Sequence, residues 1–178
     1  MKNIVLIGFM ASGKTTIGKL LAKKLSCNFY DSDELIEEKE GMTVGEIFEK
    51  FGETEFRRLE NELSKELANF ENCVIALGGG FVLNPENIEN LRKNSIIVYL
   101  KTNEEIIRNR FSYSSQTRPL MKNSQIDEVI ARFKEREKFY KNYDICINLS
   151  INNSAKAHAD EVLRKIKDYR QSLKYERK

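Results

Sequence analysis

Residues 8–15 decide the fold, and they read Gly8-Phe9-Met10-Ala11-Ser12-Gly13-Lys14-Thr15. This stretch fits the pattern Gly-x-x-x-x-Gly-Lys-Ser/Thr, a loop whose backbone N–H groups surround phosphate oxygens. An apolar run from Ile4 to Ile7 precedes the loop, and apolar residues at helical spacing follow it. The loop therefore joins a buried strand to the N-terminus of a helix, which disfavours a glycine-rich turn that binds nothing. We expect this segment to bind a nucleoside triphosphate.

Positions within the loop suggest individual roles. Gly8 and Gly13 let the chain curl so that successive N–H groups point at phosphate oxygens. We expect Lys14 to reach the β- and γ-phosphates and the Thr15 hydroxyl to bind Mg²⁺. Thr16 follows in the first helical turn. The residues of this segment that we assign to ATP binding are Gly8, Ala11, Ser12, Gly13, Lys14, Thr15 and Thr16.

The composition indicates one globular domain. The chain has 178 residues, 40% of them hydrophobic, which suffices for one sizeable core. Its 30 basic and 27 acidic residues leave a net charge of +3, too balanced to suggest wholesale nucleic-acid binding. No apolar run approaches the roughly 20 residues that span a bilayer, and the short N-terminal run reads as a strand rather than a signal peptide. Three isolated cysteines read as thiols of a reducing compartment, so we expect a cytoplasmic protein.

Short apolar strands alternate with helical patterns along the chain, which favours an α/β fold with a parallel sheet and helices on both faces. Thr43 with Glu46 forms a capping-box pattern at a helix start, and Thr102 with Glu105 repeats it. The polar, aperiodic segment 112–125 is expected to be a loop that acts as a mobile lid. Strands are expected at residues 3–7, 28–31, 73–77, 95–100 and 144–148.

Two further motifs follow expected strands, and in open parallel sheets ligands bind beyond the carboxyl ends of the strands. Asp31-Ser32-Asp33 follows the second strand, and Gly78-Gly79-Gly80 follows the third. A carboxylate pair beside a triphosphate can hold Mg²⁺ through water and accept a hydroxyl proton. Aspartate also caps helices, and both roles can coexist. The triple glycine either offers N–H groups to a ligand or forms a turn that needs positive φ.

Three arginines form the next constellation. Arg57 lies three residues before Glu60 on an expected helix, so the carboxylate can orient the guanidinium. Arg118 lies in the expected lid, from which an arginine can reach a transferring phosphoryl group. Arg136 follows on the next helix. Taken singly, each reads best as a solvated surface charge, and only their arrangement argues for a site.

Together these motifs resemble those of the shikimate kinases, a group of small P-loop kinases. The similarity spans nearly the whole chain, with the phosphate loop, the Asp-Ser-Asp element, residues 52–60, the triple glycine, Arg118-Pro119-Leu120 and Arg136 in family order. The resemblance implies one domain over residues 1–178 with the P-loop kinase fold, a five-stranded parallel sheet, a substrate-binding region at about 32–60 and a lid at about 112–125. It also implies transfer of the ATP γ-phosphoryl group to the 3-hydroxyl of shikimate, a step toward chorismate and the aromatic amino acids.

The resemblance further implies residue roles in an ATP- and Mg²⁺-dependent reaction. Asp33 would bind the shikimate hydroxyls and act as base, and Asp31 would assist Mg²⁺ through water. Lys14 and Arg118 would act on the phosphates as catalytic residues. Arg110 resembles the family arginine that packs against adenine, and Asn153 lies in the loop that completes that pocket. The residues that would bind shikimate are Asp33, Arg57, Gly78, Gly79, Gly80 and Arg136.

The phosphate loop departs from the family pattern at one position. Ala11 stands where the family usually has a further glycine. If the backbone there needs positive φ, alanine costs about 1 kcal/mol. We expect the loop to tolerate alanine less well than glycine at this position, without losing the ability to bind the nucleotide.

Three alternative functions remain open from the sequence. The first is a kinase for another small acceptor, such as gluconate or a nucleoside monophosphate. The second is a nucleotide-sensing module that has lost turnover. The third is nucleic-acid binding through the basic C-terminal tail, although an apolar stripe from Ala155 to Ile166 makes those charges a solvated helix face. We expect a monomer that binds shikimate and contacts neither nucleic acid nor membrane.

Overall fold

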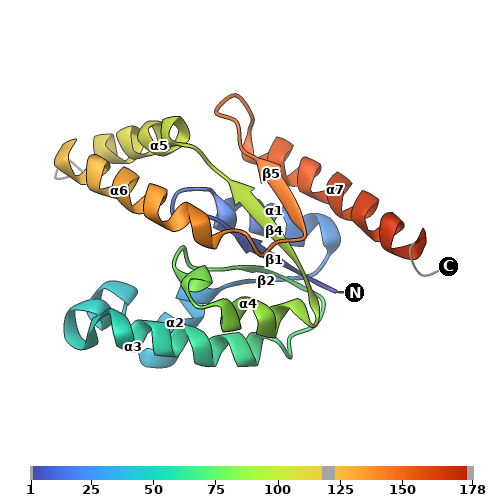
Figure 1. Cartoon of the computed structure of the whole chain (residues 1–178), viewed down its shortest axis with the longest axis horizontal. Coiled ribbons are helices and arrows are strands. Elements are labelled where there is room, and N and C mark those ends of the chain that lie inside the picture. The colour runs from blue at the N-terminus through green and yellow to red at the C-terminus, as the bar shows by residue number, and fades with distance from the viewer. Residues whose placement is uncertain (1, 118–122, 176–178) are drawn as a thin grey trace.

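A five-stranded parallel sheet forms the centre of the molecule, with the strands in the order β2-β3-β1-β4-β5 (Figure 1). The structure is a computed structural model that describes the backbone of residues 2–117 and 123–175 and the side chains of residues 2–111 and 126–174. All four strand pairings are parallel, and each strand falls where the sequence predicts it. The fold class is confirmed. The strands are β1 (Asn3–Ile7), β2 (Asn28–Asp31), β3 (Cys73–Ala76), β4 (Ser95–Lys101) and β5 (Ile145–Asn148).

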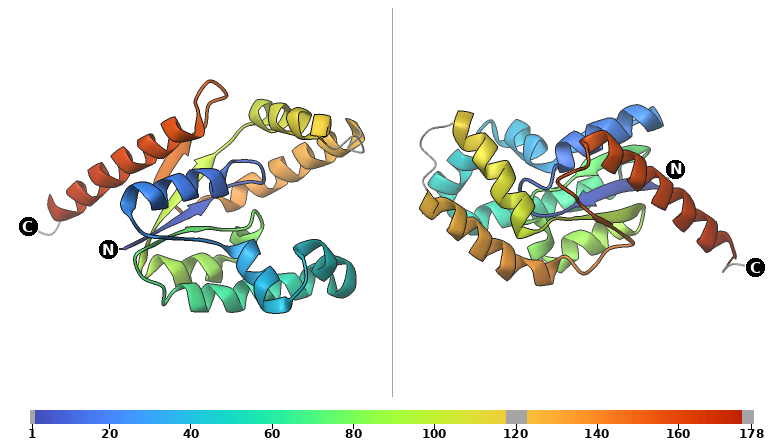
Figure 2. Two further views of the ribbon diagram at one scale, coloured as in Figure 1. Left: turned by 180° about the vertical axis from the view of Figure 1, so that it is seen from behind. Right: turned by 90° about the horizontal axis from the view of Figure 1, so that it is seen from above.

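Residues 4–7 of the central strand are apolar because both faces of the strand are covered. All five residues of β1 are buried, as expected for a strand paired on both sides and sandwiched between helices. On one face, β1 and β4 pack against α1 (Lys14–Leu25) and α7 (Ala155–Tyr175), which lie against each other (Figure 2). The helices on the other face are α2 (Ser32–Glu40), α3 (Val44–Leu67), α4 (Pro85–Arg92) and α6 (Asn123–Arg136).

Helix α3 begins as the sequence predicts. The Thr43 side chain accepts a hydrogen bond from the Glu46 backbone, and the Glu46 carboxylate accepts one from the Thr43 backbone. This is the reciprocal capping box. The helix is interrupted at Gly52, where φ is 81° and ψ 175°, so the chain changes direction before the segment that carries Arg57.

The second predicted capping box is wrong by one residue. Helix α5 (Glu104–Thr117) is capped by Asn103, whose side-chain oxygen accepts from the Ile106 N–H at 2.9 Å. Thr102 is 3% exposed, and its hydroxyl has no hydrogen-bond partner among the described residues. The Thr102 side chain therefore points into the protein from the end of β4, where it cannot reach the helix N-terminus.

The expected loop over residues 112–125 is also wrong in extent. Helix α5 continues to Thr117, and α6 begins at Asn123. The two helices lie side by side in both figures and contact each other. Tertiary packing of this kind sustains helix in a polar sequence of weak periodicity, because helical stability in proteins comes mostly from packing. Lid movement stays a prediction.

Helix α7 has the apolar stripe that the sequence predicts. Ala159, Val162 and Ile166 are buried against the sheet, and Lys167 on the same helix is exposed. The segment from Ala155 to Lys174 thus reads as an ordinary amphipathic helix. Within the described part of the chain, no helix combines the length and the apolar character needed to cross a membrane.

Strand order explains how the motifs meet. Because all strands run the same way, their carboxyl ends share one edge of the sheet. Strand β3 lies between β2 and β1, so the triple glycine after β3 separates Asp31-Ser32-Asp33 from the phosphate loop. Two short 3₁₀ helices close this edge: η1 (Phe81–Leu83) and η2 (Glu137–Phe139).

Candidate active site

The phosphate loop has the conformation that its sequence predicts. Helix α1 starts at Lys14, and its N-cap Gly13 has φ 88°. The Lys14 ammonium group donates to the carbonyl oxygens of Gly8 at 2.7 Å and Phe9 at 3.1 Å, so it lies within the loop. The Ser12 side chain is fully buried, and its hydroxyl has no protein partner among the described residues. A buried hydroxyl, an ammonium group and a helix N-terminus converge here, which suits a bound phosphate.

Ala11 carries the backbone strain that its sequence position predicts. Its φ is 60°, in the left-handed region where a β-carbon costs energy. We expect Ala11→Gly to stabilise the protein by about 1 kcal/mol, measured by urea unfolding at equilibrium. A matched control is Ala131→Gly on the exposed surface of α6, within the helix interior, which should instead destabilise by about 0.5–1 kcal/mol. Equal losses at both positions would contradict the strain argument.

Lys14 has a depressed pKa. Burial lowers the pKa of its ammonium group to about 8, and the neighbouring charges of Asp33 and Asp31 oppose that shift. A triphosphate would favour the charged form of Lys14, so the bound state should have the higher pKa.

The resulting pH dependence is testable. We expect the ATP affinity to be constant up to about pH 7.5 and to fall above pH 8, approaching about tenfold for each pH unit. Titration calorimetry between pH 6 and 10 measures this directly, and Lys14→Met should remove the decline. An ATP affinity that stays flat to pH 9.5 in the parent protein would contradict the assignment.

Thr15 and Asp31 meet at the mouth of the phosphate loop. The Thr15 hydroxyl donates to Asp31 Oδ2 at 2.7 Å. Asp31 also caps α2 through Oδ1, which accepts from the Asp33 N–H at 3.1 Å. Asp31 therefore caps α2 with one carboxylate oxygen and contacts the phosphate-loop hydroxyl with the other. A hydroxyl and a carboxylate are the oxygen donors that Mg²⁺ takes from proteins beside substrate phosphates, so these two residues fit that cation.

Asp33 faces Gly78 across the edge of the sheet. A β-carbon at Gly78 would collide with Asp33 Oδ1 and would lie 3.3 Å from Glu60 Oε1. Both of those oxygens are buried without a protein partner among the described residues. Burial raises the pKa of Asp33, with the Asp31 charge adding to the shift and the Lys14 charge opposing it. A half-buried carboxylate with an unmet oxygen and a raised pKa can accept a proton from a ligand hydroxyl.

Arg57 is held by two carboxylates. Its guanidinium donates to Glu60 at 2.6 Å and to Glu53 at 2.7 Å. The Glu60 side chain is only 1% exposed, and burial raises its pKa to about 7 although Arg57 opposes the shift. The predicted pairing of Arg57 with Glu60 is confirmed. A β-carbon at Gly80 would collide with this guanidinium, so glycine lets the backbone approach it.

The triple glycine serves close approach rather than unusual backbone angles. None of its three residues is among the glycines with positive φ in the described chain. Ser32 Oγ accepts from the Gly78 N–H at 2.7 Å, and the Tyr140 hydroxyl donates to the Gly79 carbonyl at 2.6 Å. The loop is therefore fixed from both sides.

Asp33, Arg57, Glu60 and the triple glycine line a cavity of about 820 Å³. Arg136 reaches it from α6, with a side chain 15% exposed and 3.9 Å from Glu53. Burial lowers the Arg136 pKa, and the nearby Arg57 charge adds to that effect. Two guanidinium groups thus share one end of the cavity, which suits an anionic ligand group. Asp33 lies in the same cavity beside the triple glycine.

Sequence reasoning missed several contributors to this cavity. Arg132 lines it one turn before Arg136, and that i, i+4 spacing was a usable signal. Glu53 lies within residues 52–60, but no role for it was predicted from the sequence. Ser32 and Tyr140 support the glycine loop through the contacts above, and the position of Tyr140 carries no local signal because the contact joins residues 61 positions apart.

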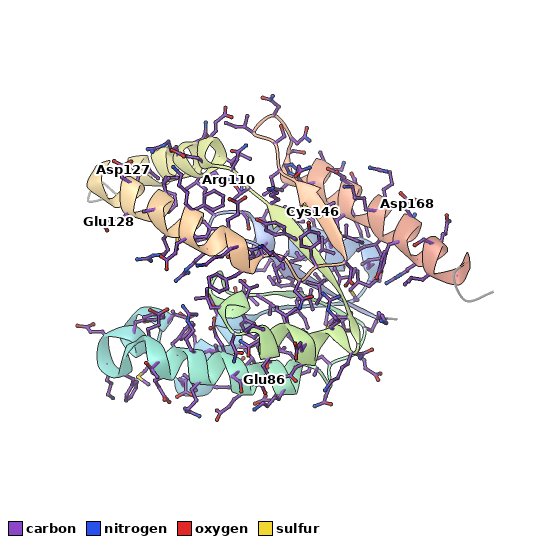
Figure 3. The ribbon with its side chains drawn as sticks, in the orientation of Figure 1. Glu86, Arg110, Asp127, Glu128, Cys146 and Asp168 are labelled. Carbon is purple, nitrogen blue, oxygen red and sulfur yellow. The ribbon has the colours of Figure 1, made fainter. Side chains whose placement is uncertain are left out.

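Arg110 lies over the phosphate loop from α5 (Figure 3). Its guanidinium donates to the Ala11 carbonyl oxygen, and both line a second, smaller cavity of about 250 Å³ with Thr16. Ala155 at the start of α7 also lines that cavity, whereas Asn153 does not. Asn153 lies in the preceding turn, where its N–H donates to Ser150. Arg118, with Pro119 and Leu120, lies outside the described residues.

Comparisons with known proteins agree with this geometry. A family model described as shikimate kinase matches residues 10–167. A shikimate kinase of Caldanaerobacter subterraneus subsp. tengcongensis is 46% identical over 165 residues, covering 92% of this chain and 95% of that protein. One from Caldicellulosiruptor bescii is 47% identical over 152 residues, covering 85% and 88%. The solved structure of a shikimate kinase from Acinetobacter baumannii in complex with shikimate superposes with a TM-score of 0.83 at 35% identity, covering 94% of each chain.

Proposed function

The chain belongs to the shikimate kinase family, and from this premise we propose that it transfers the γ-phosphoryl group of ATP to the 3-hydroxyl of shikimate. The observation that carries the proposal is the cavity that places paired arginines, Asp33 and the triple glycine beside the phosphate loop. Gly79 lies where the substrate cavity meets the phosphate loop, because a β-carbon at Gly79 would lie 3.3 Å from the Met10 backbone nitrogen. The acceptor and the triphosphate would therefore meet across this loop.

Binding of shikimate follows from its chemistry. Its carboxylate would take bidentate hydrogen bonds from Arg57 and Arg136, since planar guanidinium groups match carboxylates. Glu60 keeps Arg57 in place at 2.6 Å. The ring hydroxyls would lie against Asp33 and the glycine backbone. A sugar acid such as gluconate also has a carboxylate, but its open chain does not hold its hydroxyls at one fixed distance from that group.

The proposed reaction uses positioning and charge rather than a covalent enzyme intermediate. The acceptor oxygen attacks the γ-phosphorus, the bond from that phosphorus to the β,γ-bridging oxygen breaks, and ADP leaves. Asp33 accepts the hydroxyl proton and later releases it to solvent. Lys14 would stabilise charge on the β- and γ-phosphates, and Arg118 is proposed to act on the same phosphates. Thr15 and Asp31 would hold Mg²⁺, which neutralises phosphate charge when bound.

Placement of the nucleotide completes the proposal. The adenine would lie against Arg110 in the cavity of about 250 Å³. Asn153 would contact it from the turn that precedes α7, although Asn153 does not line that cavity. Gly8, Ala11, Ser12, Gly13 and Thr16 would bind the phosphates or lie beside them.

We further propose that the protein acts as a monomer in the cytoplasm. The residues assigned to this chain supply the phosphate-binding, base and carboxylate-binding groups of the proposed reaction, so the proposal needs no residue from a second copy. The three cysteines are free thiols, which suits a reducing compartment. Analytical ultracentrifugation at the protein concentration of the activity assay measures whether the protein is a monomer.

Product analysis tests the reaction itself. Phosphorus and proton NMR of a mixture of the protein, Mg²⁺, ATP and shikimate should show a single new phosphate ester on the 3-hydroxyl. An ester on another hydroxyl would overturn the placement of Asp33, and ATP consumption without any ester would overturn the acceptor.

A further inference from the structure

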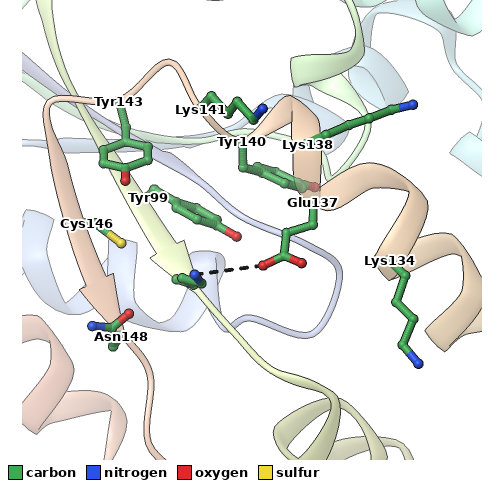
Figure 4. A pocket seen from close by; sticks show the side chains of 10 residues that line it. Tyr99, Lys134, Glu137, Lys138, Tyr140, Lys141, Tyr143, Cys146 and Asn148 are labelled. Carbon is green, nitrogen blue, oxygen red and sulfur yellow. Dashed lines mark ion pairs between the residues drawn. The ribbon is translucent and has the colours of Figure 1, made fainter.

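A separate cavity of about 680 Å³ opens between the sheet and the segment that joins α6 to β5 (Figure 4). Its sheet side is formed by Tyr99 of β4 and Cys146 of β5, and its other walls carry lysines and tyrosines. We name it the tyrosine–lysine cavity. None of its lining residues lines the substrate cavity or the cavity beside Arg110. The functions proposed above leave it without a role.

The walls of the tyrosine–lysine cavity are positively charged. Four ammonium groups line it, and Glu137 is the one carboxylate among the lining residues. Glu137 lies 3.8 Å from Lys101, the pair drawn with a dashed line in Figure 4, and Lys134 also pairs with Glu104 at 3.2 Å. A net positive lining favours an anion. The lysines are Lys101, Lys134, Lys138 and Lys141.

A buried hydroxyl points into this charged space. Tyr99 is 4% exposed, and its hydroxyl has no hydrogen-bond partner among the described residues. Figure 4 shows it directed toward the side of the cavity where Glu137 lies. Burial raises the pKa of Tyr99, so the hydroxyl keeps its proton and is available as a donor. Buried polar groups without a partner are rare in proteins and indicate a missing ligand or water.

Aromatic rings form the remaining surface. Tyr99 and Tyr140 stack with ring centroids 5.2 Å apart and planes 4° apart. The ring centroid of Tyr143 lies 5.5 Å from that of Tyr99, and Tyr143 is 39% exposed. Part of the Tyr143 ring is therefore open to a flat ligand. Lysines around an exposed tyrosine ring suit a ligand that is both charged and planar.

We propose that the tyrosine–lysine cavity binds a small anion with a flat unsaturated ring, of the aryl phosphate or aromatic carboxylate class. The anionic group accepts from the Tyr99 hydroxyl and from the lysine ammonium groups, and the ring lies against Tyr143. The cavity also borders the glycine loop, because Tyr140 stacks on Tyr99 and donates to Gly79.

Calorimetric titration with phenyl phosphate tests the proposal. The full chain is titrated in the presence of saturating shikimate, Mg²⁺ and a non-hydrolysable ATP analogue, so that the other two cavities are filled. We expect one binding event, weakened about tenfold or more by Tyr99→Phe, since hydrogen bonds to charged groups are worth this much. Lys141→Glu should weaken binding severalfold. Lys167→Glu on the opposite face of the sheet is the matched control and should leave the affinity unchanged.

Two further probes separate charge from ring. Inorganic phosphate and benzyl alcohol should each bind at least about tenfold more weakly than phenyl phosphate, because each lacks one half of the ligand. Equal affinity for inorganic phosphate would overturn the requirement for a ring.

The site itself is overturned if phenyl phosphate does not bind, or if Tyr99→Phe and Lys141→Glu bind it as well as the parent. Thermal unfolding shows whether these variants are folded, and Tyr99→Phe removes an unpaired buried hydroxyl, so its melting temperature should not fall. Shikimate turnover is measured separately, so a failure here leaves the proposed function untouched.

Discussion

Replacing Asp33 with asparagine should lower kcat by about 10²–10⁴-fold and leave the ATP affinity within about twofold of the parent value. Asparagine keeps the size of the side chain and a hydrogen-bonding oxygen, but it cannot accept the hydroxyl proton. The raised pKa of Asp33, caused mainly by burial, makes the parent carboxylate a stronger base than an exposed aspartate. Steady-state kinetics with saturating Mg-ATP and shikimate measures the loss, and calorimetry measures ATP binding.

A matched control for this change is Glu34→Gln. Glu34 is the next residue on α2, its side chain is 62% exposed, and its partner is Lys19 at 3.7 Å. Removing that charge should leave kcat unchanged. A rate close to the parent value for Asp33→Asn would show that the proton leaves by another route.

Replacing Arg57 with alanine should raise the KM for shikimate about 100-fold with a much smaller effect on kcat. Truncating one partner of a buried charge pair costs about 2–5 kcal/mol, and the carboxylate end of shikimate does not change during the reaction. Arg57→Lys keeps the charge but not the bidentate geometry, so it should raise KM about tenfold. Arg57→Ala leaves Glu60 buried without its cation and could therefore unfold the protein. Arg57→Lys keeps a cation beside Glu60, so it serves as the folded variant in which KM can be measured.

Arg58→Ala is the matched control for Arg57. Arg58 is the next residue on α3 and also pairs with two carboxylates, Glu55 and Glu62, but its side chain is 52% exposed and lines no part of the substrate cavity. Its removal should leave KM unchanged. Equal KM values for Arg57→Ala and the parent would contradict the assignment of the carboxylate end.

The strands and the local motifs could be predicted because their physical causes are local. Strand β1 is recognisable from its apolar run Ile4 to Ile7, and the phosphate loop follows it directly. The Arg57 and Glu60 side chains meet because residues three apart share a helix face. The helix cap formed by Asp31 could also be predicted, because aspartate is a preferred N-cap residue; its role in holding Mg²⁺ stays a prediction.

The two wrong predictions, the cap of α5 and the extent of the loop, depend on tertiary contacts that the sequence of one segment does not reveal. The capping oxygen of α5 belongs to Asn103 because the end of β4 turns Thr102 inward. Residues 112–117 continue α5, a helix that contacts α6, although their composition is that of a loop.

The contacts that support the site from distant parts of the sequence could not be predicted either. Ser32 and Tyr140 hold the triple glycine from elements separated from it by 46 and 61 positions. The tyrosine–lysine cavity likewise exists only because β5 pairs with β4, which brings Cys146 opposite Tyr99. Contacts of this kind depend on strand order, which the apolar pattern alone does not determine.

The most direct test of the account is ADP release with Mg-ATP, followed by a coupled assay with shikimate, quinate, gluconate and nucleoside monophosphates as acceptors. The arrangement of Asp33, Arg57 and Arg136 around one cavity predicts rapid release with shikimate and only background release with the others. Equal stimulation by gluconate or a nucleoside monophosphate would contradict the proposed acceptor. ATP binding with no stimulation by any of them would contradict the proposed catalysis and favour a nucleotide-sensing module.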